Sequence, residues 1–169
     1  LSSNFELEVD KILASVKKNT KLLFICSPNN PSGNTVDCTA IEQLLSAFNG
    51  LVVIDEAYID FTDETSWTKR INSYPNLIVT QTLSKAYGLA GIRLGICYAS
   101  QEIIAILNKI KPPYNINTLT QNAAIKALNN INKVADQIKT VLQERNRLVK
   151  AFETFVFIQN IYPSKANFI

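Results

Sequence analysis

A lysine and several phosphate-type donors lie close together near the middle of this 169-residue chain. The apolar run at residues 77–79 is followed by Thr82, Ser84 and Lys85, and Arg93 comes eight residues after the lysine. Hydroxyl groups and the two-pronged guanidinium of arginine match the oxygens of a phosphate. A buried lysine beside such donors can have a lowered pKa, which imine chemistry requires. The segment therefore predicts phosphate binding and imine chemistry at one place.

The same segment contains three glycines, Gly88, Gly91 and Gly95. Glycine lets the backbone approach a ligand closely and turn without the steric cost of a Cβ atom. A Ser-Lys pair alone is common, so a solvated loop lysine with a surface arginine is the alternative interpretation. The longer pattern, with the arginine and the glycines at this spacing, favours a ligand-binding loop.

Polar side chains also follow two earlier apolar runs. Asp55 comes directly after residues 51–54, and Tyr58 lies three residues further on. Asn30 lies in a turn that follows residues 21–26. Alone, each has an ordinary explanation: a helix N-cap or surface acid, a half-buried tyrosine, and Asn-Pro turn chemistry. Together with the lysine segment they place polar groups after three successive strands, whose carboxyl ends meet at one edge of a parallel sheet.

The composition is that of one globular domain, with 47% hydrophobic and 18% charged residues. The net charge of +3 is small and scattered, and therefore gives no argument for nucleic-acid binding. The chain has no histidine, which excludes Ser-His-Asp and Cys-His catalysis and most zinc sites within it. We expect no metal site.

The three cysteines, Cys26, Cys38 and Cys97, are odd in number and widely spaced, without a C-x-x-C motif. They predict small apolar residues in a reducing compartment, with neither a disulfide framework nor a metal site. No apolar run approaches the length of a membrane span, and the first residues lack the pattern of a secretory signal. We therefore expect a cytoplasmic protein.

Short apolar runs alternate with amphipathic segments along the chain. The expected strands are 21–26, 51–54, 76–80 and 92–99, with the opening of another at 166–169. The expected helices are 8–17, about 38–48, 101–110, 118–129 and 134–155, with a short helix within 62–73. This alternation predicts an α/β fold with a mostly parallel sheet in a three-layer α/β/α arrangement.

Three motifs carry a resemblance to a known family: SPNNPSG at 27–33, VIDEAYIDF at 53–61 and TLSKAYGLAGIRLG at 82–95. They are similar to the class I/II aminotransferases, which have the type I fold of enzymes dependent on pyridoxal 5'-phosphate (PLP). Within that class the motifs, together with KPPYNIN at 111–117, most resemble the histidinol-phosphate aminotransferases. The resemblance covers nearly the whole chain.

The resemblance implies a role for each candidate residue. Lys85 would hold PLP covalently and then move the substrate α-proton as general base and acid. Asp55 would pair with the pyridine nitrogen, which must be protonated for the ring to act as an electron sink. The remaining residues would bind the ring oxygen and the phosphate: Tyr58 and Asn30 the former, and Thr82, Ser84 and Arg93 the latter.

The resemblance also implies a reaction and partners. An amino group would pass between histidinol phosphate and 2-oxoglutarate in two half-reactions, in histidine biosynthesis. Small molecules, an amino donor and a 2-oxo acid acceptor, would be the substrates, and neither nucleic acid nor a membrane would be a partner. The family also implies a homodimer.

Residues 1–169 would form part of the PLP-binding large domain of such an enzyme. An N-terminal segment with a glycine-containing phosphate loop and a C-terminal small domain, which complete members carry, would be absent. We therefore expect apolar sheet surface to be exposed and activity of this segment alone to be in question.

Other interpretations share the same motifs. Threonine-phosphate decarboxylase and aminotransferases for aromatic or aliphatic amino acids use the same cofactor and similar sequences. A non-catalytic PLP-sensing domain, as found in transcription regulators, belongs to another functional class. A structurally inert segment is the remaining alternative.

Overall fold

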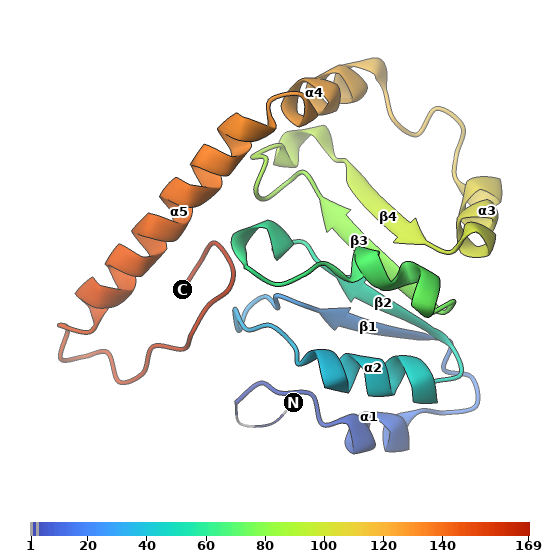
Figure 1. The fold of residues 1–169 in the computed structure, drawn as a ribbon, viewed down its shortest axis with the longest axis horizontal. Coiled ribbons are helices and arrows are strands. Elements are labelled where there is room, and N and C mark those ends of the chain that lie inside the picture. Colours follow the sequence, from blue (N-terminus) through green and yellow to red (C-terminus); the bar gives the residue numbers. More distant parts are fainter. Residues whose placement is uncertain (1, 3) are drawn as a thin grey trace.

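A single four-stranded sheet organises the computed structural model, which describes residue 2 and residues 4–169 (Figure 1). The strands lie side by side in chain order: β1 (Leu22–Cys26), β2 (Leu51–Asp55), β3 (Leu77–Thr82) and β4 (Gly95–Ala99). β1, β2 and β3 are parallel, whereas β4 runs antiparallel to β3. The sheet is therefore mostly parallel, which confirms the prediction from the sequence.

Helices connect and follow the strands. The α-helices are α1 (Val9–Ser15), α2 (Cys38–Ala47), α3 (Gln101–Ile110), α4 (Thr118–Leu128) and α5 (Ile131–Phe152), and the 3-10 helices are η1 (Ile59–Phe61), η2 (Trp67–Ser73) and η3 (Ala90–Ile92). The side chains of Asp37, Ser100 and Asn117 accept a hydrogen bond from a backbone N–H in the first turn of α2, α3 and α4. Such caps satisfy donors that a helix leaves free, so they fix where these three helices begin.

One face of the sheet packs against α2 and η2 and forms the main core. Successive strand residues point to opposite faces, so every second side chain of β1, β2 and β3 lies on this side. Ile41 and Leu44 of α2 are fully buried against this face, and Trp67 of η2 belongs to the same hydrophobic cluster. The buried strand residues of this core are Ile25, Val52, Ile54, Leu77 and Val79.

The opposite face is open at β1. Leu22 and Phe24 are 49% and 67% exposed, although both belong to an apolar strand. In β1 they alternate with the buried Ile25, as the two-residue period of a strand requires. The exposed apolar sheet surface expected from the sequence is therefore present.

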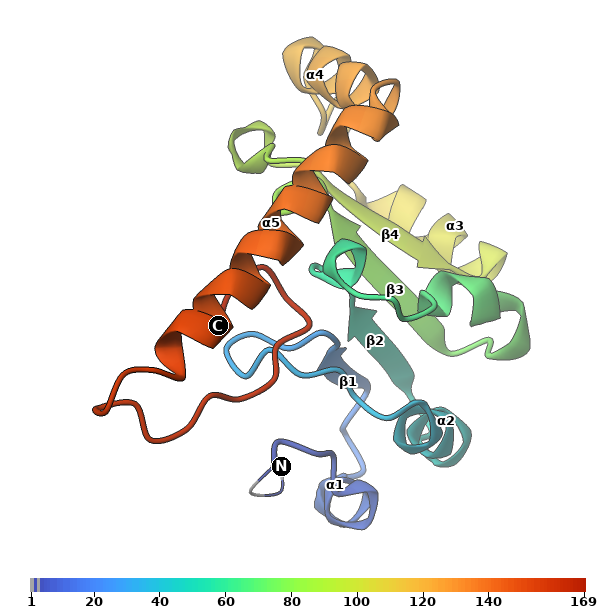
Figure 2. The ribbon, with the colours of Figure 1, turned by 60° about the vertical axis from the view of Figure 1, so that its left-hand side comes forward.

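The longest helix, α5, runs along the edge of the sheet where β1, β2 and β3 end (Figures 1 and 2). Ile138, Val141 and Leu142 recur at helical spacing and pack against a second apolar cluster that contains Tyr58 and Phe61. In the described part of the chain, no helix combines the length and the apolar character needed to cross a membrane.

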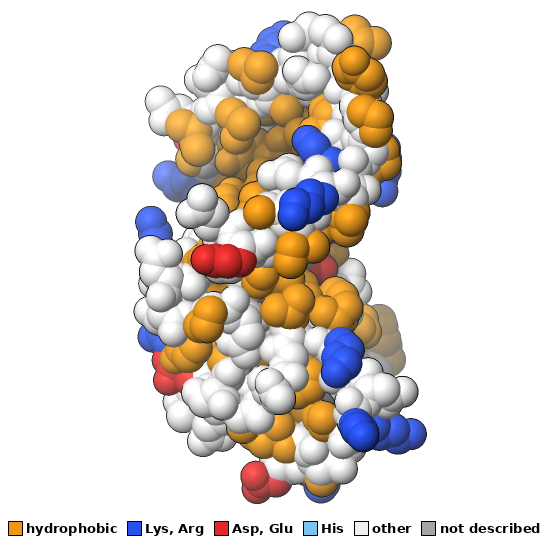
Figure 3. All heavy atoms as spheres, turned by 90° about the vertical axis from the view of Figure 1, so that its right-hand side faces the viewer, with side chains coloured by type: hydrophobic (Ala, Val, Ile, Leu, Met, Phe, Trp, Pro, Cys, Tyr) orange, Lys and Arg blue, Asp and Glu red, His pale blue; other side chains and the backbone are white. Residues whose placement is uncertain are grey.

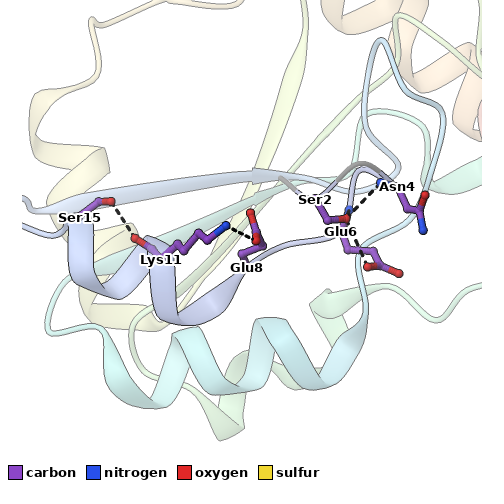
Figure 4. A network of polar contacts seen from close by, with 6 residues as sticks. All are labelled: Ser2, Asn4, Glu6, Glu8, Lys11 and Ser15. Carbon is purple, nitrogen blue, oxygen red and sulfur yellow. Dashed lines mark hydrogen bonds and ion pairs between the residues drawn. The ribbon is translucent and has the colours of Figure 1, made fainter.

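Short-range polar contacts hold the segment before α1 (Figure 4). The hydroxyl of Ser2 accepts hydrogen bonds from the backbone N–H groups of Asn4 and Glu6. At the start of α1, the ammonium of Lys11 donates to Glu8 over 2.5 Å, and this bond lowers the pKa of the Glu8 carboxyl. Both groups face solvent, so the pair contributes little to stability.

Three expectations differ from the structure. Residues 166–169 are not a strand: the backbone of residues 165 and 166 bonds instead to Gly33 and to the side chain of Arg145. The helix expected within 62–73 is the 3-10 helix η2, after a separate 3-10 turn, η1. Residues 92–94 lie outside β4, because η3 and a left-handed residue, Arg93, precede it.

Candidate active site

The carboxyl ends of β1, β2 and β3 form the edge at which most of the candidate residues lie. Asp55, the last residue of β2, is in register with Cys26 on one side and Thr80 on the other. The Asp55 carboxylate is partly buried and accepts a hydrogen bond from the backbone N–H of Ala57 over 3.1 Å. The chain thus holds a carboxylate at the centre of the edge, as the sequence predicted.

Asn30, Tyr58 and Lys85 converge from three different strand ends. The side-chain amide of Asn30 donates to the Tyr58 hydroxyl over 2.9 Å. The ammonium of Lys85 lies 5.2 Å from the centre of the Tyr58 ring, within the range of a cation–π interaction. Tyr58 itself is buried, with 6% of its surface exposed. Because its hydroxyl accepts from Asn30, the tyrosine proton is available to a further acceptor.

The loop that carries Asn30 is shaped by its own hydrogen bonds. The N–H of Gly33 donates to the carbonyl of Asn29, and the N–H of Asn29 donates to the carbonyl of Asn34, each over 2.8 Å. Gly33 has a φ of +75°, a left-handed conformation that favours glycine. The turn signal in the sequence therefore marks a closed loop that presents Asn30 toward Tyr58.

Lys85 is exposed, so the expectation of a buried lysine is wrong. A tight turn follows β3, with hydrogen bonds from the N–H of Gly88 to the carbonyl of Lys85 and from Leu89 to Leu83. This turn buries Leu83 and Ala86 and leaves the lysine between them facing solvent. The amine can therefore be reached by a ligand from outside.

The hydroxyl groups expected to bind phosphate lie together. The hydroxyl of Thr82 donates to that of Ser84 over 2.9 Å and accepts from the Ser84 backbone N–H over 3.1 Å. Thr82 also pairs with Gly95 across the β3–β4 ladder. Arg93, two residues before Gly95, is exposed and donates to the carbonyl of Ala90. The contacts within the described chain do not join its guanidinium to the two hydroxyl groups.

Sequence reasoning missed two residues at this site. The ring of Phe168 contacts that of Tyr58 edge to face, with the ring centres 5.4 Å apart. Gly33, in the Asn30 loop, has Ser164 directly against its α-carbon. Both contacts join the end of the chain to early segments. Periodicity carries no signal for either contact, and the turn residues at 27–33 indicate a turn without indicating what packs against Gly33.

The family model described as "Aminotransferase class I and II" matches residues 1–169. The chain therefore belongs to the class I and II aminotransferases, a PLP-dependent family.

The particular relatives are histidinol-phosphate aminotransferases. The chain is 53% identical to the histidinol-phosphate aminotransferase of Flavobacterium johnsoniae, over 100% of this chain and 48% of the relative. It is 54% identical to the protein of that name from Christiangramia forsetii, again over 100% of this chain and 48% of the relative. The chain thus spans about half the length of the curated relatives it matches.

Solved structures give the same result for the fold. The histidinol-phosphate aminotransferase from Clostridium acetobutylicum superposes with a TM-score of 0.88 at 26% identity, over 98% of this chain and 51% of that one. The enzyme of the same name from Sinorhizobium meliloti, solved in complex with pyridoxal-5'-phosphate, has a TM-score of 0.81 at 26% identity, over 94% and 44%. An L-threonine-O-3-phosphate decarboxylase from Porphyromonas gingivalis, at 24% identity and a TM-score of 0.76 over 90% and 48%, shows the fold alone.

Proposed function

We propose that this chain forms the cofactor-binding core of a PLP-dependent aminotransferase that transfers an amino group from histidinol phosphate to 2-oxoglutarate. The observation that carries the proposal is the convergence of Asn30, Tyr58 and Lys85 from three strand ends. An exposed amine beside a hydrogen-bonded amide and phenol is suited to a ligand with a reactive carbonyl and an anionic ring oxygen.

The donor set fits PLP group by group. The Asp55 carboxylate is an acceptor for a protonated ring nitrogen, and the Asn30 amide and Tyr58 hydroxyl are donors for the ring oxygen. The Ser84 hydroxyl, which accepts from Thr82, keeps its own proton for the phosphate, and Thr82 becomes a second donor when its hydroxyl turns from Ser84 to the ligand. We assign Arg93 to the phosphate as well, because it lies beside Leu94, whose carbonyl oxygen is 3.4 Å from the Thr82 hydroxyl.

Each residue has a defined task in this proposal. When bound, PLP supplies an aldehyde that condenses with amines and a ring that withdraws electrons from the α-carbon. Lys85 Nζ provides the resident amine and then takes and returns the α-proton of the substrate. Asp55 keeps the ring nitrogen protonated through its negative charge, while Tyr58 and Asn30 stabilise charge on the oxygen side.

The substrate proposal is supported by the 53% identity to a protein named histidinol-phosphate aminotransferase. Threonine-phosphate decarboxylase and other aminotransferases remain alternatives, since the residues of the site serve the cofactor and not a particular side chain. A cytoplasmic location goes with this proposal: the cysteines are free and exposed, as suits a reducing compartment.

We also propose that residues 1–169 belong to a large PLP-binding domain and that the protein acts as a homodimer. Exposed apolar side chains on and after α3 and on α4 support association: Ile106, Ile110, Tyr114, Leu119 and Ile125. Figure 3 looks onto the side that carries α3 and shows hydrophobic side chains spread over that face. Extended apolar surface of this kind is typical of protein interfaces.

The deciding experiment is an absorbance spectrum of the full-length protein with added PLP, before and after borohydride reduction. We expect a visible band that borohydride fixes onto Lys85, located by peptide mass spectrometry. Lys85→Ala removes the band, and Lys109→Ala, which removes an exposed lysine of α3, leaves it unchanged. Absence of a Lys85-dependent band in the full-length protein would refute the cofactor assignment.

A substrate panel then tests the reaction. Histidinol phosphate with 2-oxoglutarate is expected to give glutamate at a rate well above that of aromatic or aliphatic amino acids. Release of carbon dioxide from threonine phosphate would instead identify the decarboxylase alternative.

A further inference from the structure

The segment Ser164–Phe168, which we name the C-terminal strap, is fastened to three separate parts of the molecule. The backbone N–H of Lys165 donates to the carbonyl of Gly33 over 2.7 Å. The guanidinium of Arg145, on α5, donates to the carbonyl of Ala166, also over 2.7 Å. The ammonium of Lys165 pairs with Asp63 over 2.7 Å. Ala166, between these attachments, is completely buried.

The strap lies directly against the loop that carries Asn30. A Cβ atom built on Gly33 would lie 2.7 Å from the Ser164 hydroxyl oxygen and 3.1 Å from the Ser164 Cα. These distances are too short for a side chain, so only glycine permits this approach. The hydrogen bond from Lys165 to the Gly33 carbonyl closes the same contact. The position of the Asn30 loop is therefore tied to the position of the strap.

The strap also reaches Tyr58. The ring of Phe168 lies edge to face on the Tyr58 ring, at 87° between planes and 5.4 Å between centres. Ala166 and Phe168 share one apolar cluster with Tyr58 and with Ala86, the residue after Lys85. Aromatic pairs of this geometry restrict the orientation of the ring that they contact.

We propose that the C-terminal strap sets the Asn30–Tyr58 hydrogen-bond pair, with Phe168 and Gly33 as its positioning residues. Phe168 fixes the Tyr58 ring, and Gly33 holds the Asn30 loop against Ser164 and Lys165. Neither positioning residue acts on the ligand itself. The proposal rests on the proposed function, because the pair that they position is assigned to the ring oxygen of the cofactor.

A measurable consequence is the protonation of the bound cofactor. The Tyr58 hydroxyl and the Asn30 amide are the two donors assigned to the ring oxygen, and both favour its anionic form. They thereby lower the pH midpoint at which the visible absorbance band of the bound cofactor changes. Loosening one donor weakens a hydrogen bond to a charged group, so the titration midpoint rises by about half a pH unit or more. Loss of stability alone does not move this midpoint.

The test compares Phe168→Leu with Phe157→Leu in the full-length protein loaded with PLP. Phe157 is 77% exposed and lies outside the Tyr58 cluster, so its substitution makes the same chemical change without touching the pair. Borohydride fixation first establishes that cofactor is bound to Lys85 in the unmodified protein. The visible band is then titrated against pH. We expect an upward shift for Phe168→Leu and none for Phe157→Leu.

Gly33→Ala provides a second variant that acts on the other member of the pair. It forces the loop and Ser164 apart and is expected to shift the midpoint in the same direction. If Phe168→Leu does not bind cofactor, the pH midpoint of the visible band in Gly33→Ala tests the strap proposal in its place. A midpoint unchanged in the loaded variants would overturn the strap proposal and leave the proposed function intact. Absence of Lys85-bound cofactor in the unmodified protein would overturn both.

Discussion

The side-chain amide of Asn30 donates a 2.9 Å hydrogen bond to the hydroxyl of Tyr58, across a sequence separation of 28 residues. Parallel pairing of β1 with β2 makes this contact possible, because both residues follow the carboxyl ends of neighbouring strands. The sheet therefore acts as a frame that brings two polar side chains from separate motifs to one point. The Lys85 ammonium lies on the ring of the same tyrosine.

Removal of the Tyr58 hydroxyl is expected to impair catalysis more than folding. Tyr58→Phe keeps the buried ring and its contact with Phe168, but leaves the Asn30 amide without its acceptor. The variant also loses the donor that we assign to the anionic ring oxygen of the cofactor. A lost hydrogen bond to a charged group costs about 1.5–3 kcal/mol, so kcat/KM should fall about 10- to 100-fold. Steady-state kinetics of the full-length protein measure this, with Tyr74→Phe as the control. An unchanged kcat/KM would exclude Tyr58 from the site.

The motifs and their convergence were predictable because they depend on local rules. Apolar runs identified the four strands, and parallel strands place their carboxyl ends at one edge. Asp55, Tyr58 and Asn30 follow such strands in the sequence, so their place at that edge follows from the pattern of apolar runs. The helix boundaries differ by only a few residues from those expected, and in the structure Asp37 and Asn117 cap the starts of α2 and α4.

The orientation of Lys85 and Arg93 was not predictable from the sequence. Whether a residue after a strand faces the interior depends on the turn that follows, and here the turn buries Leu83 and Ala86 on either side of the lysine. Arg93 has a φ of 54°, which is incompatible with an extended strand. The strand expected at 92–99 therefore begins only at Gly95. The contact of Phe168 with Tyr58 joins segments far apart in the chain, where sequence pattern carries no distance information.

The buried carboxylate of Glu56 is expected to be a major contributor to stability. It is 1% exposed and accepts hydrogen bonds from the Ser66 hydroxyl, the Trp67 backbone N–H and the Gln81 side chain. Glu56→Ala leaves these donors without their acceptor and should lower the free energy of unfolding by about 2–4 kcal/mol.

Urea unfolding followed by circular dichroism measures the effect of Glu56→Ala. The control is Glu144→Ala, which removes an exposed ion pair with Arg147 and should cost less than about 1 kcal/mol. Equal losses for the two variants would show that the Glu56 network contributes no more than a surface pair.

The pair between Asp63 and Lys165 should be lost in acid. The hydrogen bond from Lys165 lowers the pKa of the Asp63 carboxyl below its ordinary value. Because the folded-state pKa lies below that of the unfolded chain, the stabilisation is complete above the unfolded value. It is then lost as the pH falls through the folded value.

A carboxyl-detected NMR titration checks the pKa of Asp63. Lys165→Ala should return it toward the ordinary value, whereas Lys150→Ala, which removes a lysine of α5 without this contact, should not. An identical Asp63 titration in the Lys165→Ala variant would contradict the assigned pair.

Association of the full-length protein should depend on the exposed apolar surface of α4. Leu119 is 82% exposed, and a charge placed there would have to be buried in any interface that covers it. Leu119→Asp should therefore shift the protein from dimer to monomer in size-exclusion chromatography with light scattering. Asn122→Asp adds the same charge to the same helix and is the control. An unmodified protein that elutes only as a monomer would contradict the dimer proposal.

The charge of Asp55 should lower the reactivity of the neighbouring Cys26 thiol. Both thiols keep exposed surface but are partly desolvated; this desolvation, and secondarily the Asp55 carboxylate, raise the pKa of Cys26, whereas desolvation alone raises the pKa of Cys97. Asp55→Asn keeps an oxygen to accept from the Ala57 N–H but removes the charge. In cofactor-free protein it should lower the Cys26 pKa and accelerate iodoacetamide alkylation below that pKa, because only the thiolate reacts. Cys97 is the internal control: its alkylation rate should not change. Equal acceleration at both cysteines would indicate that the substitution loosens the sheet, and no acceleration at Cys26 would mean that the Asp55 carboxylate does not face the thiol.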